Sequence, residues 1–144
     1  MSHLRRYVLP AILLVLCGAV RSASAEIEIR KDGAAWAAVD NDGTIRINGS
    51  AVGKFESDGI VRKKGKEVGK IDSDGVIRVK GQSIGSIEAG GTLRKAGAEF
   101  GAIESGGDIR KNGSKWGSAT NVSDHDGKRA VAAVLVFFDH FFKK

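Results

Sequence analysis

The sequence predicts a mainly β fold: a radial ring of five or six short hairpins from a 16-residue repeat, with a C-terminal amphipathic helix packed on the ring. Three observations predict it. Arginine recurs every sixteen residues, glycines separate short apolar stretches, and a longer apolar segment follows the repeats. The arginines in register are Arg30, Arg46, Arg62, Arg78, Arg94 and Arg110. Six matches in register exclude chance, so the repeat reflects repeated structure.

Residues 1–25 have the pattern of a secretory signal peptide. Arg5 and Arg6 precede an apolar run from Tyr7 to Val20, and the small residues of Ala23–Ala25 suit a cleavage site. The run is shorter than the ~20 residues that span a membrane, and a retained N-terminal anchor is the alternative. We therefore expect an exported protein, either periplasmic or extracellular.

The chain after this leader has no cysteine and little net charge. Cys17 is the only cysteine, so we expect no disulfide. Loss of Arg5, Arg6 and Arg21 with the leader lowers the formal net charge from +6 to +3. This mild excess, together with export, argues against nucleic acid as a partner.

Each copy of the repeat follows the pattern x-I-R-x-x-G-x-x-V-G-x-I-x-S-D-G. Frequent glycine disfavours helix by roughly 1 kcal/mol per interior position, whereas short β-rich runs between S-D-G or N-D-G turns are typical of hairpins. A three-residue loop over Ser57–Gly59 places Phe55 opposite Val61 and Lys54 opposite Arg62. This register separates an apolar face from a cationic face, and a two-residue loop would mix them.

Five complete turns define five hairpins and leave two end strands. Glu26 to Arg30 and Lys115 to Ser118 match the two arms of one more hairpin. Their pairing would close the ring as a sixth unit and hide both sheet edges. A five-unit ring with an end strand used differently is the alternative. We assign residues 26–120 to this domain.

Residues 121–144 leave the repeat and predict a loop and a helix that cap the repeat domain. Val131, Leu135, Phe138 and Phe142 recur at helical spacing. Such an apolar helix needs cover, so we expect it to lie over one mouth of the ring. A buried strand over the same residues is one alternative, and an interface with a partner or a membrane surface is another.

The units VGKFESDGIVR, VGKIDSDGVIR and IGSIEAGGTLR, with the segment KWGSATNVSDHDGKRAVAAVLVFFDHFF after them, resemble the bacterial beta-flower proteins. The resemblance covers roughly residues 26–144. It implies an exported or envelope protein whose short hairpins are arranged radially like petals. It implies no enzymatic activity, and the number of petals is not carried over.

The repeated arginines and two tryptophans are the candidate binding residues. If the units are radially equivalent, the guanidinium groups form a ring that suits a polyanion or an anionic glycan. The alternative is local pairing of each arginine with an acid such as Glu56 or Asp72. Trp36 and Trp116 occupy equivalent positions in the first and last units, where they would stack sugar rings or close the seam of the ring.

The sequence predicts neither a metal site nor a catalytic site. The turns at Asp40 and Asp72 begin like calcium loops, but the twelfth position holds Ala51 and Ser83 instead of glutamate. The neighbours Asp124–Asp126 include a histidine, but adjacency in sequence does not make a catalytic triad. No cofactor is expected.

These features predict a non-enzymatic exported β-repeat protein that acts as a structural or binding module. The second hypothesis is a glycan- or polyanion-binding module that uses the repeated arginine face. The expected partner is an envelope polysaccharide or another protein. Membrane contact is expected only through an uncleaved leader or, as the second choice, through the C-terminal helix.

Overall fold

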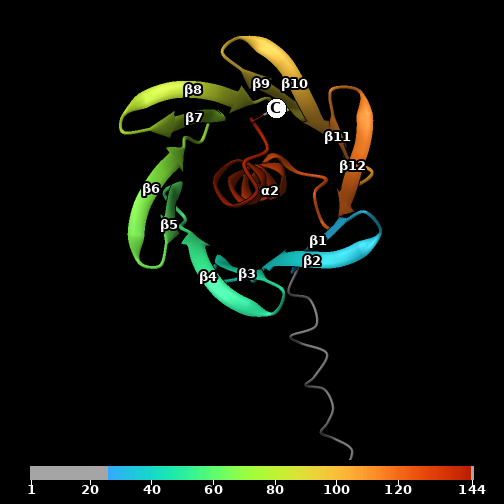
Figure 1. Ribbon diagram of the computed structural model, residues 1–144. Helices are drawn as coiled ribbons and strands as arrows, with labels where there is room; N and C mark the ends of the chain where they lie inside the picture. The colour runs from blue at the N-terminus through green and yellow to red at the C-terminus, as the bar shows by residue number, and fades with distance from the viewer. Residues whose placement is uncertain (1–25, 144) are drawn as a thin grey trace, which may run out of the picture.

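A computed structural model describes residues 26–143, so the predicted leader lies outside the described residues. Within residues 26–143 the chain forms twelve antiparallel strands, which pair in chain order into one closed barrel around the helix α2, His125–Phe138 (Figure 1). The strands are β1 (Ile27–Lys31), β2 (Ala34–Val39), β3 (Thr44–Ile47), β4 (Ser50–Phe55), β5 (Ile60–Lys63), β6 (Lys66–Ile71), β7 (Val76–Val79), β8 (Gln82–Ile87), β9 (Thr92–Lys95), β10 (Ala98–Ile103), β11 (Asp108–Lys111) and β12 (Ser114–Ala119).

Three-residue turns join the strands at one end of the barrel, in the register that the sequence predicts. Between β4 and β5, Phe55 lies opposite Val61 and Lys54 lies opposite Arg62. Gly59 closes this turn with a φ of 95°, a left-handed value that glycine adopts without steric cost. The predicted division into an apolar and a cationic face is therefore confirmed.

Two-residue turns, which the sequence analysis does not predict, join the strands at the other end. Between β3 and β4, Ile47 lies opposite Ser50 across Asn48 and Gly49, whose φ values are 52° and 86°. Positive φ at both positions defines a type I′ turn, whose twist matches that of the flanking strands. Every strand thus pairs on both sides. The expected ring of five or six radial hairpins is wrong in this respect, because the strands form one continuous barrel.

The two end strands close the barrel, as one of the two alternatives predicts. Strand β1 pairs antiparallel with β12, with Arg30 opposite Ser118. Just beyond the strands, the Glu28 N–H donates to the Thr120 hydroxyl at 2.9 Å. The strands of residues 26–143 consequently leave no open sheet edge on which another chain could add.

Every repeat has a β-bulge at the same position. In the first repeat, Ile29 lies opposite Ala37 and Arg30 lies opposite Ala35, so Trp36 has no opposite residue. The equivalent bulged residues are Val52, Val68, Ile84, Phe100 and Trp116. Bulges bend a strand and increase its twist. Their regular recurrence distributes the bend of the sheet around the barrel.

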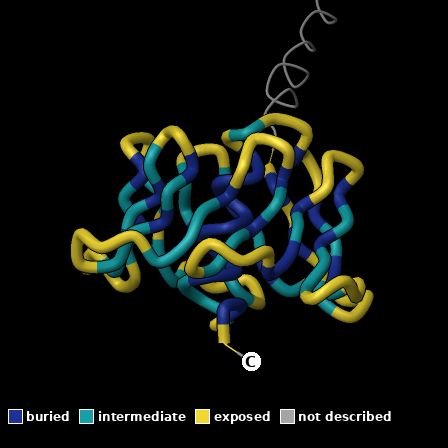
Figure 2. The backbone as a smooth tube through the Cα atoms, turned by 90° about the horizontal axis from the view of Figure 1, so that it is seen from above, coloured by how far each residue is buried: buried dark blue, intermediate teal, exposed yellow. Residues whose placement is uncertain are grey.

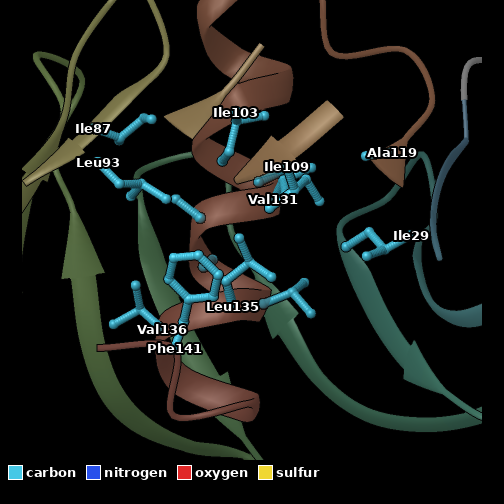
Figure 3. Close-up of a cluster of buried hydrophobic side chains, with 14 of the residues drawn as sticks. Ile29, Ile87, Leu93, Ile103, Ile109, Ala119, Val131, Leu135, Val136 and Phe141 are labelled. Carbon is cyan, nitrogen blue, oxygen red and sulfur yellow. The ribbon is translucent and has the colours of Figure 1, made fainter. Parts of the chain in front are cut away.

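The aliphatic residue before each arginine points into the barrel and is fully buried. These residues are Ile29, Ile45, Val61, Ile77, Leu93 and Ile109. Because side chains alternate along a strand, the arginines that follow point outward. Figure 3 shows several of the buried side chains around α2. Glycine on the wall allows close approach of the C-terminal phenylalanines: a Cβ atom on Gly53 would lie 2.6 Å from the ring of Phe138.

The predicted C-terminal helix, packed against the strands, is confirmed, and the alternative of a buried strand is wrong. Asp124 caps α2, because its Oδ1 atom accepts the Gly127 N–H at 2.7 Å. Residues 127–136 are buried on all sides of the helix. Instead of covering one mouth, α2 runs through the ring, and the exposed residues form the outer turns (Figures 1 and 2). No helix within residues 26–143 has both the length and the apolar character needed to cross a membrane.

Candidate functional site

The six repeated arginines lie on the outside of the barrel, one in each repeat, and we call them the arginine belt. The Arg62 Nε atom donates to Glu56 Oε2 at 2.8 Å. Equivalent pairs at 2.6–3.0 Å join Arg46 to Asp40, Arg78 to Asp72, Arg94 to Glu88 and Arg110 to Glu104. Arg30, in the first repeat, pairs with Glu28 at 3.2 Å. The local ion pairing that the sequence suggests is confirmed for every member of the belt.

Several belt arginines also support the two-residue turn of their own repeat. The Nη1 atom of Arg62 donates to the Gly65 carbonyl at 3.5 Å, and Arg78 makes the equivalent bond to Gly81 at 3.4 Å. Hydrogen bonding to its carboxylate partner raises the pKa of Arg46, as it does for Arg94. Belt side chains are 35–49% exposed. The guanidinium groups therefore stabilise the turns through hydrogen bonds, and part of each side chain stays accessible to solvent.

The two candidate tryptophans meet at the seam of the barrel. The rings of Trp36 and Trp116 are edge to face, with centroids 5.8 Å apart. Lys31 Nζ lies 5.6 Å and 5.3 Å from the two ring centroids, and Phe141 packs on Trp116 at 5.7 Å. The indoles thus face the C-terminal segment while the belt faces outward. Trp36 and Arg46 both line a surface pocket of about 390 Å³, so the structure brings one candidate tryptophan beside one belt arginine.

Acidic side chains gather at the end of the barrel that carries the three-residue turns, and we call this end the acidic rim. Its carboxylates are Glu26, Asp40, Asp42, Glu56, Asp58, Asp72, Asp74, Glu88, Glu104, Asp108, Asp124 and Asp126. Five of these carboxylates, namely Asp40, Glu56, Asp72, Glu88 and Glu104, are the ion-pair partners of belt arginines. Lys54 and Lys70 lie beside carboxylates of this rim, and Lys128 and Arg129 are buried there. Thr44 donates to Asp42 at 3.0 Å, and this bond lowers the pKa of that carboxyl group.

Lysines gather at the opposite end, around the two-residue turns, and we call this end the basic rim. Its lysines are Lys31, Lys63, Lys64, Lys66, Lys80, Lys95, Lys111, Lys115 and Lys143. The carboxylates described there are fewer, namely Asp32, Glu67, Glu99 and Asp139. Lysines therefore outnumber carboxylates at the basic rim, and most of the described carboxylates lie at the acidic rim.

Some basic-rim lysines hold the end of the chain in place. Lys31 Nζ donates to Asp139 Oδ1 at 2.8 Å, Lys111 Nζ donates to the Lys143 carbonyl at 3.1 Å, and Lys95 donates to the Phe142 carbonyl. Sequence reasoning missed these lysines. The signal that could have found them is their position directly after a belt arginine, which places them on the inner face of the strand.

A cavity of about 410 Å³ opens at the acidic rim beside the start of α2. Val39 and Phe55 contribute apolar surface, and Asp42, Asp126 and Arg129 contribute charge. The buried Arg129 donates to the Ile71 carbonyl at 2.6 Å and to Asp126 at 3.2 Å. Its Nε atom has no hydrogen-bond partner among the described residues. This cavity could not be predicted from the sequence, because its shape depends on where the helix lies inside the barrel.

The Asp124–Asp126 segment does not form a charge relay. Asp124 is used as the helix cap, Asp126 pairs with Arg129, and His125 Nδ1 is buried without a partner among residues 26–143. In the same part of the chain, no group of three or more histidine, cysteine, aspartate or glutamate side chains could hold a metal ion.

Two features of this geometry are therefore candidates for recognition: the belt with its paired arginines, and the oppositely charged rims. The belt is continuous around the barrel because each repeat contributes one arginine. The rims differ because aspartate and glutamate gather in or beside the three-residue turns, whereas lysine gathers in or beside several of the two-residue turns. Comparison of the chain with family models, curated proteins and solved structures gives no match.

Proposed function

We propose that this protein is a non-enzymatic exported module that acts by binding or supporting other components of the cell envelope through its outer surface. The observation that carries the proposal is the filled interior. Val131, Ala132, Ala133, Val134 and Leu135 of α2 are completely buried inside the barrel. The charges, in contrast, lie on the outside and at the rims. A solid body with a charged exterior is suited to surface recognition.

Two further observations support the location and the class. The leader over residues 1–25 is typical of export, and the chain after it contains no cysteine, so it folds without a disulfide in an oxidising compartment. The repeat resembles that of the beta-flower proteins, and we propose membership of that family. Because the strands form a closed barrel, we propose that this chain shares the 16-residue unit with the beta-flower proteins, and not an arrangement of separate petals.

The second candidate is a module that binds a glycan or polyanion through the arginine belt. Exposure of 35% or more in each belt side chain favours it. The internal ion pairs weigh against it, because an incoming anion must compete with a carboxylate that already accepts a hydrogen bond. We therefore place this function second.

A retention experiment tests both candidates. The immobilised protein is exposed to separate polysaccharide, protein and lipid fractions of a bacterial envelope at low and high salt. Retention of at least one fraction is expected, and retention of none contradicts the binding role. Arg62→Ala with Arg78→Ala tests the belt. Lys54→Ala with Lys70→Ala is the matched control, because these lysines lie opposite the same arginines in neighbouring strands. Loss of polysaccharide in the arginine variant alone favours the second candidate.

A further inference from the structure

The basic rim presents exposed cations at the tips of the barrel. Lys63, Lys64, Lys66 and Lys80 are exposed on or beside the two-residue turns, and Figure 2 shows the exposed turns at this end of the molecule. Lys115 is also exposed, but its Nζ atom pairs with Asp108 at 3.3 Å. Lys143 adds an exposed cation at the end of the chain. Most of the exposed lysines flank two neighbouring turns, at Lys64–Gly65 and Lys80–Gly81, so one side of the rim carries a group of separate positive charges.

The acidic rim, at the opposite end, makes the charge distribution of the molecule asymmetric. The acidic rim carries carboxylates from nearly every repeat, including Asp42, Asp58 and Asp74 at exposed turn positions. Near an anionic surface, attraction at one end and repulsion at the other orient the barrel with its basic rim toward that surface. The arginine belt does not set this orientation, because its arginines pair with acidic-rim carboxylates such as Glu56 and Asp72. The orientation comes from the rim carboxylates that have no belt arginine as partner.

The centre of the basic rim has an apolar character. Half-buried Trp36, Trp116, Phe137 and Phe138 lie here with the chain end. Lys63 Nζ lies 5.6 Å from the centroid of the Phe138 ring. Lysine stems beside aromatic rings match the boundary between lipid headgroups and acyl chains, where aromatic residues and long cationic side chains are both favoured.

We propose that the basic rim is a docking surface for an anionic phospholipid bilayer. This inference rests on the proposed binding role and names the partner. Lysines act as dispersed point charges, and dispersed charges suit a surface of many headgroups. A polyanion in solution is better matched by bidentate arginine, and the belt arginines are already paired with carboxylates. The charge pattern therefore favours a bilayer over a polyanion.

The test measures sedimentation with vesicles of phosphatidylcholine alone and of phosphatidylcholine with phosphatidylglycerol. A chain that begins at Glu26 is used, because every strand pair and the whole of α2 lie after this residue and the apolar leader would bind lipid itself. Lys66→Glu with Lys143→Glu reverses two charges on the rim. Lys54→Glu with Lys70→Glu reverses two charges at the level of the belt. Unfolding midpoints confirm that both variants fold.

We expect binding to the anionic vesicles only, and loss of that binding in 1 M salt, where the Debye length is about 3 Å. The rim variant should bind about 25-fold more weakly or worse, because one lysine near a membrane surface is worth about a fivefold change in affinity and two lysines are changed. The belt-level variant should stay within about twofold of the parent chain. Equal losses in the two variants would overturn the proposal, as would equal binding to both kinds of vesicle.

Two other outcomes would reassign the rim. Binding of heparin that depends on Lys66 and Lys143, without vesicle binding, would make the ligand a polyanion. The protein without vesicles is also sedimented at increasing concentration. A sedimentation coefficient that rises with concentration in the parent chain but not in the rim variant, together with no vesicle binding, would make the partner a second copy of the chain. Retention of an envelope fraction without vesicle binding would overturn this inference while leaving the proposed binding role in place.

Discussion

Arg62 illustrates what one residue of the belt does for the fold. Its Nε atom binds Glu56 and its Nη1 atom binds the Gly65 carbonyl, so one side chain joins a three-residue turn to a two-residue turn. Both partners of the ion pair are about one-third exposed, and solvent weakens such a pair. The repetition of arginine thus follows from a repeated local role, with or without a ligand.

A double-mutant cycle measures this role. We expect Arg62→Ala to lower the free energy of unfolding by less than about 1 kcal/mol, and the coupling energy with Glu56→Ala to be about 0.2–1 kcal/mol. Chemical denaturation gives both values. The same cycle at Arg94 and Glu88, a pair with a more exposed acid, is the control and should give no larger coupling. A coupling above about 2 kcal/mol would show that the pair is more important to stability than its exposure allows.

Gly53 illustrates a different demand, for space inside the barrel. A Cβ atom here would clash with the Arg62 carbonyl and would lie 2.6 Å from Phe138. We expect Gly53→Ala to destabilise the protein by about 1–3 kcal/mol, as overpacking does. Gly90→Ala is the control, because nothing lies within 4 Å of its Cβ position. That change should be neutral or slightly stabilising in denaturant titrations. Equal effects would mean that the glycines serve only the flexibility of the chain.

At this scale the sequence predicted the arginine pairs and the register of the three-residue turns. Both depend on residues close together in the chain, so the repeat pattern contains the information. The lysines that bind the end of the chain were missed. Lys31 and Asp139 are separated by 108 residues, and their meeting depends on where α2 ends inside the barrel.

At the scale of elements, the two turns of each repeat differ in type and in the residues that signal them. The two-residue turns need positive φ at both positions, yet only two of the six contain Asn-Gly, at Asn48 and Asn112. Lys64, Lys80 and Ala96 adopt the same left-handed conformation without the side chain that signals it. The three-residue turns were easier to recognise than the type I′ turns, because Asp-Gly marks three of the five, at Asp42, Asp58 and Asp74.

Helix α2 fills the core of the barrel, and the burial of its side chains contributes to the free energy of unfolding. Leu135 is completely buried between the helix and the wall. We expect Leu135→Ala to lower the free energy of unfolding by about 2–5 kcal/mol, through lost burial and the cavity left behind. Gln82→Ala, on an exposed turn, should stay within about 0.5 kcal/mol of the parent chain. If Leu135→Ala costs no more than this control, the helix is not packed as described.

At the scale of the whole molecule, the number of strands must give a barrel wide enough to enclose the helix. The sequence predicted the helix from the apolar periodicity of the tail. It offered the closure as one of two alternatives, because the two end strands are complementary. It could not predict that the helix enters the lumen. The width of a barrel depends on the number, tilt and stagger of all its strands, and these properties belong to the assembled sheet.

Deletion of residues 60–75 tests this match, because it removes one repeat and joins Gly59 to Val76 in register. The remaining ten strands can still pair in order, but their barrel is narrower and α2 no longer fits. We expect loss of cooperative unfolding by circular dichroism and exposure of apolar surface to a hydrophobic dye. As the control, a second copy of residues 76–91 replaces the deleted repeat and restores twelve strands. This variant should unfold cooperatively. The second copy of Gly85 takes the place of Gly69, and the second copy of the Ile87 carbonyl takes the place of the Ile71 carbonyl, which accepts a hydrogen bond from Arg129. A stable, cooperative ten-strand protein with α2 still buried would show that the wall adapts to the helix, and that repeat number does not determine the fold.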